Sequence, residues 1–383
     1  MQEASCAESD QIMARLRATF SKWLGRASMG VGRCDPAPIC SAEPNSTPAT
    51  EDAPALESYQ SKMTKEIERF KDVENVHDLP QIFHYWSNKF LFPMCCDCGF
   101  SGVTDLFASE LYAAAVRSGN PKPQFISIGS GNCDLEVEVA RLLVGKGLAE
   151  FSLECLELNP HMLARGKTNS ENGGVADRLI FSEGDFNVWK PNKQYTSVMA
   201  NHSLHHVVNL EDLFDGIKSS LEPAGSFVAA DMIGRNGHQR WPEALAVLEN
   251  FWQELPESYR YNRLLRRLEQ DFMDWDCSVE GFEGIRAQDI LPLLIERFDF
   301  SLFMGFANVV SPFVDRGFGH NFDATADWDR NFIDRVHAAD EEGFANGRLK
   351  PTQMMAVMTP GPAGSHAFSR GISPAKALRD PRT

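Results

Sequence analysis

The feature that most constrains the fold is a regular alternation of short apolar runs and amphipathic stretches between Gln124 and Ile233. Each apolar run is bounded by Gly, Asn or Pro, and the segments between the runs have helical periodicity. Short buried strands that alternate with helices form βαβ units, in which neighbouring strands are parallel. The expected strands cover residues 125–128, 151–158, 179–181, 196–200 and 226–233. The pattern therefore predicts a doubly wound α/β sheet.

The alternation stops after Ile233, and the sheet is expected to be completed further along the chain. A helical pattern at 289–298 leads into a strand-like run at 300–310, and a last strand is expected at 352–358. Two insertions, 237–285 and 311–350, are too long to be simple connections. Helical periodicity over 241–270 predicts that the first insertion is a helical lid.

Composition sets the remaining boundaries. Residues 1–58 and 361–383 are rich in Pro, Ser, Ala or Gly, and we expect disordered tails there. Between them the sequence predicts a helical lid region at 59–120, a core at 121–236, the lid insertion at 237–285, and completion of the core at 286–360.

Charge and cysteine usage limit the partners. The formal net charge of -16 opposes binding to nucleic acid, because such binding depends on Lys and Arg releasing counterions. No apolar run approaches the roughly 20 residues that cross a bilayer, and the chain starts with acidic residues, so a cytoplasmic protein is expected. Cys95, Cys96 and Cys98 lack the second ligand pair that is typical of zinc sites, and we predict no metal site.

The first expected strand ends in a turn that contains Gly129 and Gly131. Glycine permits a sharp backbone bend and the close approach of a ligand at the positive end of the next helix. This pattern alone occurs in dinucleotide enzymes, in methyltransferases and in turns without a ligand. The glycine pattern becomes informative only together with the residues at the ends of the strands that follow.

Polar and aromatic side chains follow the next three strands. Glu157 ends the second strand, where a carboxylate can accept hydrogen bonds from a ribose diol. Asp185 follows the third strand and can accept from an adenine amine, with Phe186 or Trp189 available for stacking. The polar groups after the fourth strand emerge at the same edge of the sheet.

In these residues the chain resembles the class I S-adenosylmethionine-dependent methyltransferases over about 124–358, excluding the two insertions. The resemblance implies a Rossmann-like sheet, mostly parallel with an antiparallel last strand, and S-adenosyl-L-methionine as cofactor. It also implies that Gly129 and Gly131 face the methionine part of the cofactor, Glu157 the ribose, Asp185 with Phe186 the adenine, and Asn201 with His202 the sulfonium side.

The chain departs from the family pattern at two positions. Ser127 stands where the family often has an acidic residue, and Cys133 replaces a frequent third glycine. A dinucleotide enzyme would have its last glycine at Asp134, which argues against that class.

The acceptor is expected to be a small molecule that is methylated on oxygen or nitrogen. Neither the Asn-Pro-Pro-aromatic motif of nucleobase amine methyltransferases nor the Pro-Cys of cytosine enzymes follows the fourth strand. Three alternatives stay open: a protein- or RNA-directed enzyme, a non-catalytic cofactor-binding protein, and a thiol or arsenic methyltransferase that uses the cysteine cluster.

Candidate acceptor residues come from two places. His205 and His206 are the candidate general bases, with a structural role as the alternative. Asp231 could point into the same crevice, or it could form a helix cap or a loop hydrogen bond. Arg260, Arg263 and Arg267 have helical spacing and would share one face of the lid, either toward an anionic acceptor or toward solvent. Tyr261 and Trp241 are candidates for the wall of the acceptor pocket, with lid packing as the alternative.

Overall fold

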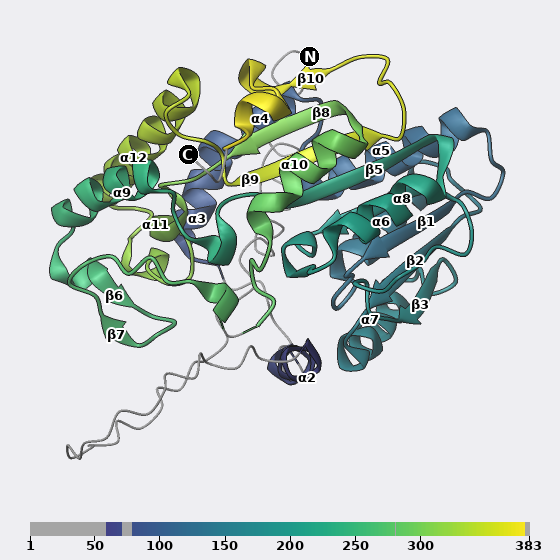
Figure 1. Ribbon diagram of the computed structural model, residues 1–383, viewed down its shortest axis with the longest axis horizontal. Helices are drawn as coiled ribbons and strands as arrows, with labels where there is room; N and C mark the ends of the chain where they lie inside the picture. The colour runs from purple at the N-terminus through teal and green to yellow at the C-terminus, as the bar shows by residue number, and fades with distance from the viewer. Residues whose placement is uncertain (1–58, 71–78, 280, 380–383) are drawn as a thin grey trace, which may run out of the picture.

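The computed structural model describes residues 59–70, 79–279 and 281–379, so the expected tail at 1–58 lies outside the described residues. Its centre is an eight-stranded sheet in the order β10-β8-β9-β5-β4-β1-β2-β3 (Figure 1). The strands are β1 Gln124–Ile128, β2 Ser152–Glu157, β3 Leu179–Glu183, β4 Tyr195–Asn201, β5 Leu221–Met232, β8 Asp299–Phe306, β9 Gln353–Thr359 and β10 Ala367–Phe368.

Strand directions confirm the predicted sheet. β1 to β5 are all parallel, whereas β9 lies between β5 and β8 and is antiparallel to both. The chain order reverses at β1, which has β2 on one side and β4 on the other. In open α/β sheets, ligands bind outside the carboxyl ends of the strands at such a reversal. The glycine loop follows β1 and therefore starts at that point.

Helices cover both faces of the sheet. They are α2 Tyr59–Phe70, α3 Gln81–Trp86, α4 Phe92–Asp97, α5 Val103–Ser118, α6 Asp134–Gly145, α7 Pro160–Asn172, α8 Leu210–Ser220, α9 Pro242–Glu254, α10 Ala287–Arg297, α11 Ser311–Val314, α12 Asp327–Asn346 and α13 Pro374–Ala377. Along β5, Val228 and Ala230 pack with α5 and α6, whereas Phe227 and Ala229 pack with α8 and α10. Within the described residues, no helix has the length and apolarity to cross a bilayer.

The predicted long helix over 241–270 is wrong beyond Glu254. Pro256 has no N–H and its ring is incompatible with a continuing helix, so α9 ends just before it. A 3-10 turn at Glu257–Arg260 and a two-stranded hairpin follow, formed by β6 Tyr261–Asn262 and β7 Arg267–Leu268. α3, α9, α11 and α12 gather on the left of Figure 1, with this hairpin below them.

The expected disordered tail after residue 360 is also corrected, because the chain is ordered through Arg379. β10 adds to the edge of the sheet beside β8, and α13 buries Ala377 against it. Arg379 then bonds Glu243 at 2.9 Å and lies 4.7 Å from the centre of the Trp241 ring. A Pro- and Gly-rich sequence concealed these contacts because they are made with residues far away in the chain.

Replacing Trp252 by Ala is expected to lower the free energy of unfolding by about 3–5 kcal/mol. Its side chain is fully buried, and its ring contacts those of Phe272, Phe313 and Phe318, so the change leaves a large cavity. Urea denaturation followed by fluorescence and circular dichroism measures the loss. Val116→Ala on the exposed face of α5 is the control and should change stability by less than about 0.5 kcal/mol; equal effects of the two substitutions would contradict this packing.

Candidate functional site at the carboxyl ends of the strands

The glycine loop after β1 requires glycine at two positions. Gly129 has φ +70° and Gly131 has φ +56°, a region of backbone conformation that favours glycine. A Cβ on Gly129 would lie 2.5 Å from the Cβ of Ser203. Ser203 is held there because its hydroxyl donates to the carbonyl of Ile128 at 2.6 Å. The loop therefore presents bare backbone at the reversal point of the sheet.

Both departures from the family pattern have a local explanation. Ser127 donates its hydroxyl to the carboxylate of Glu136 at 2.7 Å, so the acidic group behind the loop comes from α6 rather than from β1. Cys133 adopts the left-handed conformation at φ +55° that a glycine would adopt more easily. Gly166 on α7 makes room for it, because a Cβ there would lie 2.7 Å from the Cys133 sulfur.

Glu157 ties the glycine loop to the end of β2. One carboxylate oxygen accepts from the N–H of Gly131 at 2.8 Å, and the other accepts from the N–H of Asn159 at 2.9 Å. Burial raises the pKa of Glu157, and these N–H groups offset part of the rise. A carboxylate has about four acceptor positions, so Glu157 keeps capacity to accept from a ligand hydroxyl as well.

The end of β3 is covered by α2. The hydroxyl of Tyr59 donates to Asp185 at 2.6 Å, and the amide of Asn187 donates to Tyr59 at 2.9 Å. α2 also approaches β4, since Glu66 lies 3.1 Å from His206. Asn187 is not among the residues predicted from the sequence, although it stands two residues after Asp185.

These elements enclose a pocket at the edge of the sheet. It is lined by Glu66, Ile67, Gly129, Gly131, Glu157, Leu158, Asn159, Met162, Phe186, Asn187, His202, Ser203, His206 and Phe282. We call it the cofactor pocket. Of the residues predicted for the cofactor, Asp185 and Asn201 are outside this lining, and the other five are in it. The polar atoms Nδ1 of His202 and Oδ1 of Asn201 are buried without a hydrogen-bond partner, as is typical of groups that await a ligand.

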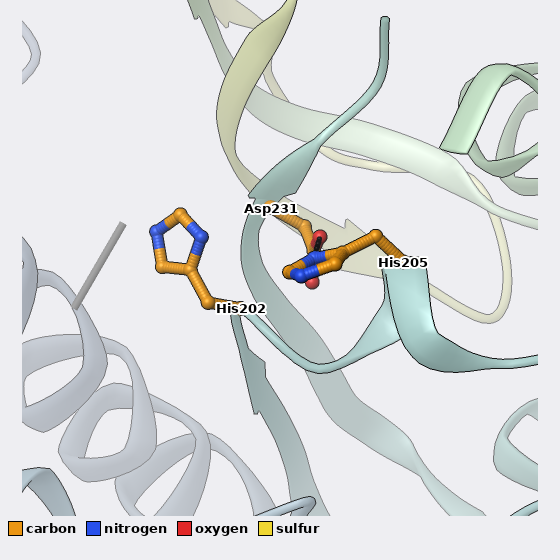
Figure 2. Close-up of side chains that lie close together, drawn as sticks. All are labelled: His202, His205 and Asp231. Atoms are coloured by element: carbon orange, nitrogen blue, oxygen red, sulfur yellow. Dashed lines mark hydrogen bonds and ion pairs between the residues drawn. The ribbon is translucent and has the colours of Figure 1, made fainter. Parts of the chain in front are cut away.

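Asp231 at the end of β5 organises the segment after β4. One oxygen accepts from the N–H groups of Ser203 and Leu204 at 2.9 and 2.8 Å, and the other bonds Nδ1 of His205 at 2.6 Å. Figure 2 shows the His205 ring against this carboxylate, whereas the ring of His202 lies apart from the pair. Both members of the pair are buried. Of the two roles left open for Asp231, its contacts support positioning the loop that carries the histidines.

A second carboxylate completes a histidine cluster. Glu283 is buried and lies 2.7 Å from Nε2 of His238, 3.5 Å from Nε2 of His205 and 3.5 Å from Nε2 of His206. Glu283 and His238 are not among the residues predicted from the sequence, because they lie in the first insertion without any motif around them.

Burial and charge act in opposite directions on these groups. Burial disfavours the charged forms of Glu283 and His205. The three histidines nevertheless hold the pKa of Glu283 well below its usual range, and Asp231 with Glu283 raises the pKa of His205 to about 10. Burial lowers the pKa of His202 to about 4, so its ring is neutral at physiological pH.

A second cavity of about 200 Å³ is lined by Glu283. Its polar lining also includes His238, Gln239, Arg240 and Asp274, and its aromatic lining includes Phe83, Trp86, Phe272, Trp275 and Phe318. We call it the acceptor cavity, after the role that is proposed for it below. Nε of Arg240 is buried there without a hydrogen-bond partner. His206 in the cofactor pocket and His238 in the acceptor cavity thus meet at the same carboxylate.

The four residues predicted to bind the acceptor lie elsewhere. Arg260 donates to the carbonyls of Leu255, Gln270 and Gln253, and Arg263 donates to Asn321. Tyr261 lies in the hairpin, and Trp241 is packed between Arg235 and Arg379. They are absent from the linings of both cavities, because the helix that would have aligned the arginines does not form. The cysteine cluster in and after α4 is likewise outside both linings.

The fold and the site define a Rossmann-like protein with a ligand pocket at the glycine loop. Residues 128–229 match the family model described as a methyltransferase domain. This match confirms the methyltransferase domain that the sequence predicted, and it supports the resemblance to the class I S-adenosylmethionine-dependent enzymes. The matched span contains the glycine loop, Glu157 and the three histidines after β4, but it ends before Asp231.

Individual relatives are distant. Trichosetin synthetase PKS-NRPS1 of Gibberella fujikuroi is 28% identical over 116 residues, which are 29% of this chain and 3% of that protein. A SAM-dependent methyltransferase from Geobacter sulfurreducens, solved with S-adenosyl-L-homocysteine, has 14% identity and a TM-score of 0.37, covering 67% of this chain and 91% of that one. The DhpI-SAH complex has 12% identity and a TM-score of 0.34, covering 80% and 100%. At these TM-scores the structural likenesses carry no weight for the site.

Replacing Gly129 by Ala is expected to weaken S-adenosylhomocysteine binding at least tenfold, a loss of about 1.4 kcal/mol. The new methyl group would collide with Ser203 and impose a strained φ on the loop. Calorimetric titration measures the change. Gly145→Ala at the end of α6 is the matched control, because a Cβ there meets nothing within 4 Å. Unchanged affinity in Gly129→Ala would contradict a ligand at this loop.

Proposed function

We propose that the protein transfers a methyl group from S-adenosylmethionine to an oxygen or nitrogen of a small molecule held in the acceptor cavity. The observation that carries the proposal is the contact between residues of the two cavities. His206 lines the cofactor pocket, His238 lines the acceptor cavity, and Glu283 lies within 3.5 Å of both rings. Methyl transfer requires the acceptor atom within about 3–3.5 Å of the methyl carbon, so an acceptor held in the acceptor cavity would extend past these side chains to the cofactor, shielded from water.

The residues of the cofactor pocket fit the cofactor by chemistry. The free acceptor positions of Glu157 suit the ribose hydroxyls, and the bare backbone at Gly129 and Gly131 suits the methionine part. Phe186 offers a ring for the adenine. When bound, the cofactor supplies a methyl group that is already activated by its sulfonium.

For the adenine and the sulfonium we retain the roles that the sequence predicted for Asp185, Asn201 and His202. Asp185 binds the adenine together with Asn187, sharing its carboxylate with Tyr59 of α2. Asn201 and the neutral ring of His202 lie toward the sulfonium side, where their unpartnered atoms are available. α2 covers this pocket through Tyr59, Glu66 and Ile67 and helps to exclude water.

His206 is the proposed general base for an acceptor hydroxyl or protonated amine. It lines the cofactor pocket and lies beside two carboxylates, Glu66 at 3.1 Å and Glu283 at 3.5 Å, which would stabilise the imidazolium after proton uptake. His205 is in neither cavity lining, so we assign it a positioning role: its bond to Asp231 fixes the loop that carries His206.

The acceptor cavity favours a small molecule with both a flat apolar part and a polar group. Its aromatic residues provide the apolar surface, and Arg240 provides an unpartnered donor for an oxygen. The alternative is a protein- or RNA-directed enzyme. The net charge of -16 opposes an RNA acceptor, and a polypeptide acceptor would require an open groove rather than this cavity.

Label transfer tests the proposal. The full chain is incubated with methyl-labelled S-adenosylmethionine and a cell extract that is afterwards separated into small-molecule, protein and RNA fractions. We expect the label in the small-molecule fraction. We expect Glu157→Ala to abolish labelling, because the carboxylate that accepts hydrogen bonds from the ribose is lost. Label in the protein or RNA fraction would support the alternatives, and its absence from all three fractions would contradict methyl transfer.

Arg240→Met separates the acceptor cavity from the cofactor pocket. We expect the KM for the labelled acceptor to rise at least tenfold, because Arg240 lines only the acceptor cavity, while S-adenosylhomocysteine affinity stays unchanged. Arg263→Met is the matched control, since Arg263 bonds Asn321 and is in neither lining. An unchanged KM in Arg240→Met would place the acceptor elsewhere.

A further inference from the structure

Three side chains next to the acceptor cavity converge on one point: His205 and Glu283 are buried, and His238 is partly buried. Nε2 of His205 lies 3.5 Å from Glu283 Oε1, and Nε2 of His238 lies 2.7 Å from the same oxygen. All three donor atoms lie within 4.8 Å of one another. Ligands at about 2.0–2.1 Å from a tetrahedral ion are roughly 3.3 Å apart, so small side-chain rotations bring the three atoms to metal-binding distances.

The donor atoms are oriented but not fully satisfied. Nδ1 of His205 is bonded to Asp231, which directs Nε2 toward Glu283. That Nε2 and Oε2 of Glu283 are buried without a hydrogen-bond partner. A carboxylate on one ring nitrogen, with the other nitrogen free, is the usual arrangement of a metal-ligating histidine. Asp231 and Glu283 are two buried carboxylates that meet at His205, and a divalent cation would balance both charges.

The neighbouring group of His202, His205 and Asp231 is a weaker candidate. Its atoms are equally close, but both oxygens of Asp231 already accept hydrogen bonds, from Ser203 and Leu204 on one side and from His205 on the other. The His202 ring also lies apart from the pair (Figure 2). The atoms that remain available to bind an ion therefore lie on the side of His205 that faces Glu283.

Backbone hydrogen bonds fix the three segments that carry these ligands. The N–H of Ile285 donates to the carbonyl of His205 at 3.1 Å, and the N–H of Gly237 donates to the carbonyl of Gly284 at 2.9 Å. Gly284 is packed so closely that a Cβ there would lie 3.0 Å from Cε1 of His238. The three ligands are thus held by cross-linked segments rather than by a free loop, as a preorganised site requires.

We propose that Nε2 of His205, Nε2 of His238 and the carboxylate of Glu283 bind a divalent first-row transition ion, for which Zn²⁺ is the probe. Two imidazoles and one carboxylate form a known ligand set of catalytic zinc sites, which keep a further position open. His238 and Glu283 line the acceptor cavity, so that position faces the acceptor. The sequence predicted no metal site because these ligands come from three separate segments.

The role of the ion rests on the proposed function, whereas its binding does not. An ion at this position would bind the oxygen of the acceptor and would lower the pKa of its hydroxyl. The acceptor is accordingly a hydroxyl compound, and the atom that is methylated is oxygen rather than nitrogen.

The test is zinc titration of the full chain after treatment with a chelator. We expect one tightly bound Zn²⁺ per chain and at least a hundredfold weaker binding in His238→Ala. His161→Ala is the matched control, because His161 is an exposed histidine on α7, and it should leave the affinity unchanged. Circular dichroism checks that the variants fold. No stoichiometric Zn²⁺ binding, or equal binding in wild type and a folded His238→Ala, would overturn the proposal.

A second measurement needs no variant. In crystals of the unsubstituted chain soaked with Zn²⁺, the anomalous difference peak at the zinc edge should lie between His205, His238 and Glu283. A peak only at other residues would contradict the assignment of these three residues as metal ligands. S-adenosylhomocysteine is titrated into the same zinc-free and zinc-loaded samples. Binding of this ligand without zinc binding refutes the metal site alone, whereas zinc binding without it refutes the proposed function.

Discussion

The arrangement of the site depends on the buried carboxylate of Asp231. It ends β5, yet it binds the backbone of Ser203 and Leu204 and the ring of His205, all of which follow β4. Without this carboxylate, two backbone N–H groups would be buried without acceptors, at a cost of about 1–3 kcal/mol each. The same contact orients Ser203, which closes the space over Gly129. One side chain therefore couples the glycine loop to the histidine cluster.

The cofactor side of the site could be predicted because its signals are local in sequence. Gly129, Gly131, Glu157 and His202 each stand at a strand end, and the parallel sheet brings strand ends together whatever the intervening helices contain. The acceptor side gave no such signal. Glu283 and His238 are adjacent only because the first insertion folds back, with Gly237 bonded to Gly284. No periodicity encodes that contact.

Two wrong predictions, the long helix and the disordered C-terminal tail, came from reading the sequence pattern alone. Arginines at 260, 263 and 267 match a helical period, but Pro256 ends the helix before them, and the period then has no structural meaning. The segment after residue 360 lacks any pattern, yet it is ordered by Arg379 stacking on Trp241 and by pairing of β10 with β8. In the first case a local helix breaker ended the helical period, and in the second case tertiary contacts overrode local propensity.

We expect the glycine loop and Glu157 to bind S-adenosylmethionine and not a dinucleotide. Calorimetric titration of S-adenosylmethionine, S-adenosylhomocysteine and NAD into the full chain distinguishes the two classes of ligand. We expect micromolar binding of both sulfur compounds at one site per chain, and no measurable binding of NAD. Binding of NAD in preference, or of none of the three ligands, would contradict this expectation.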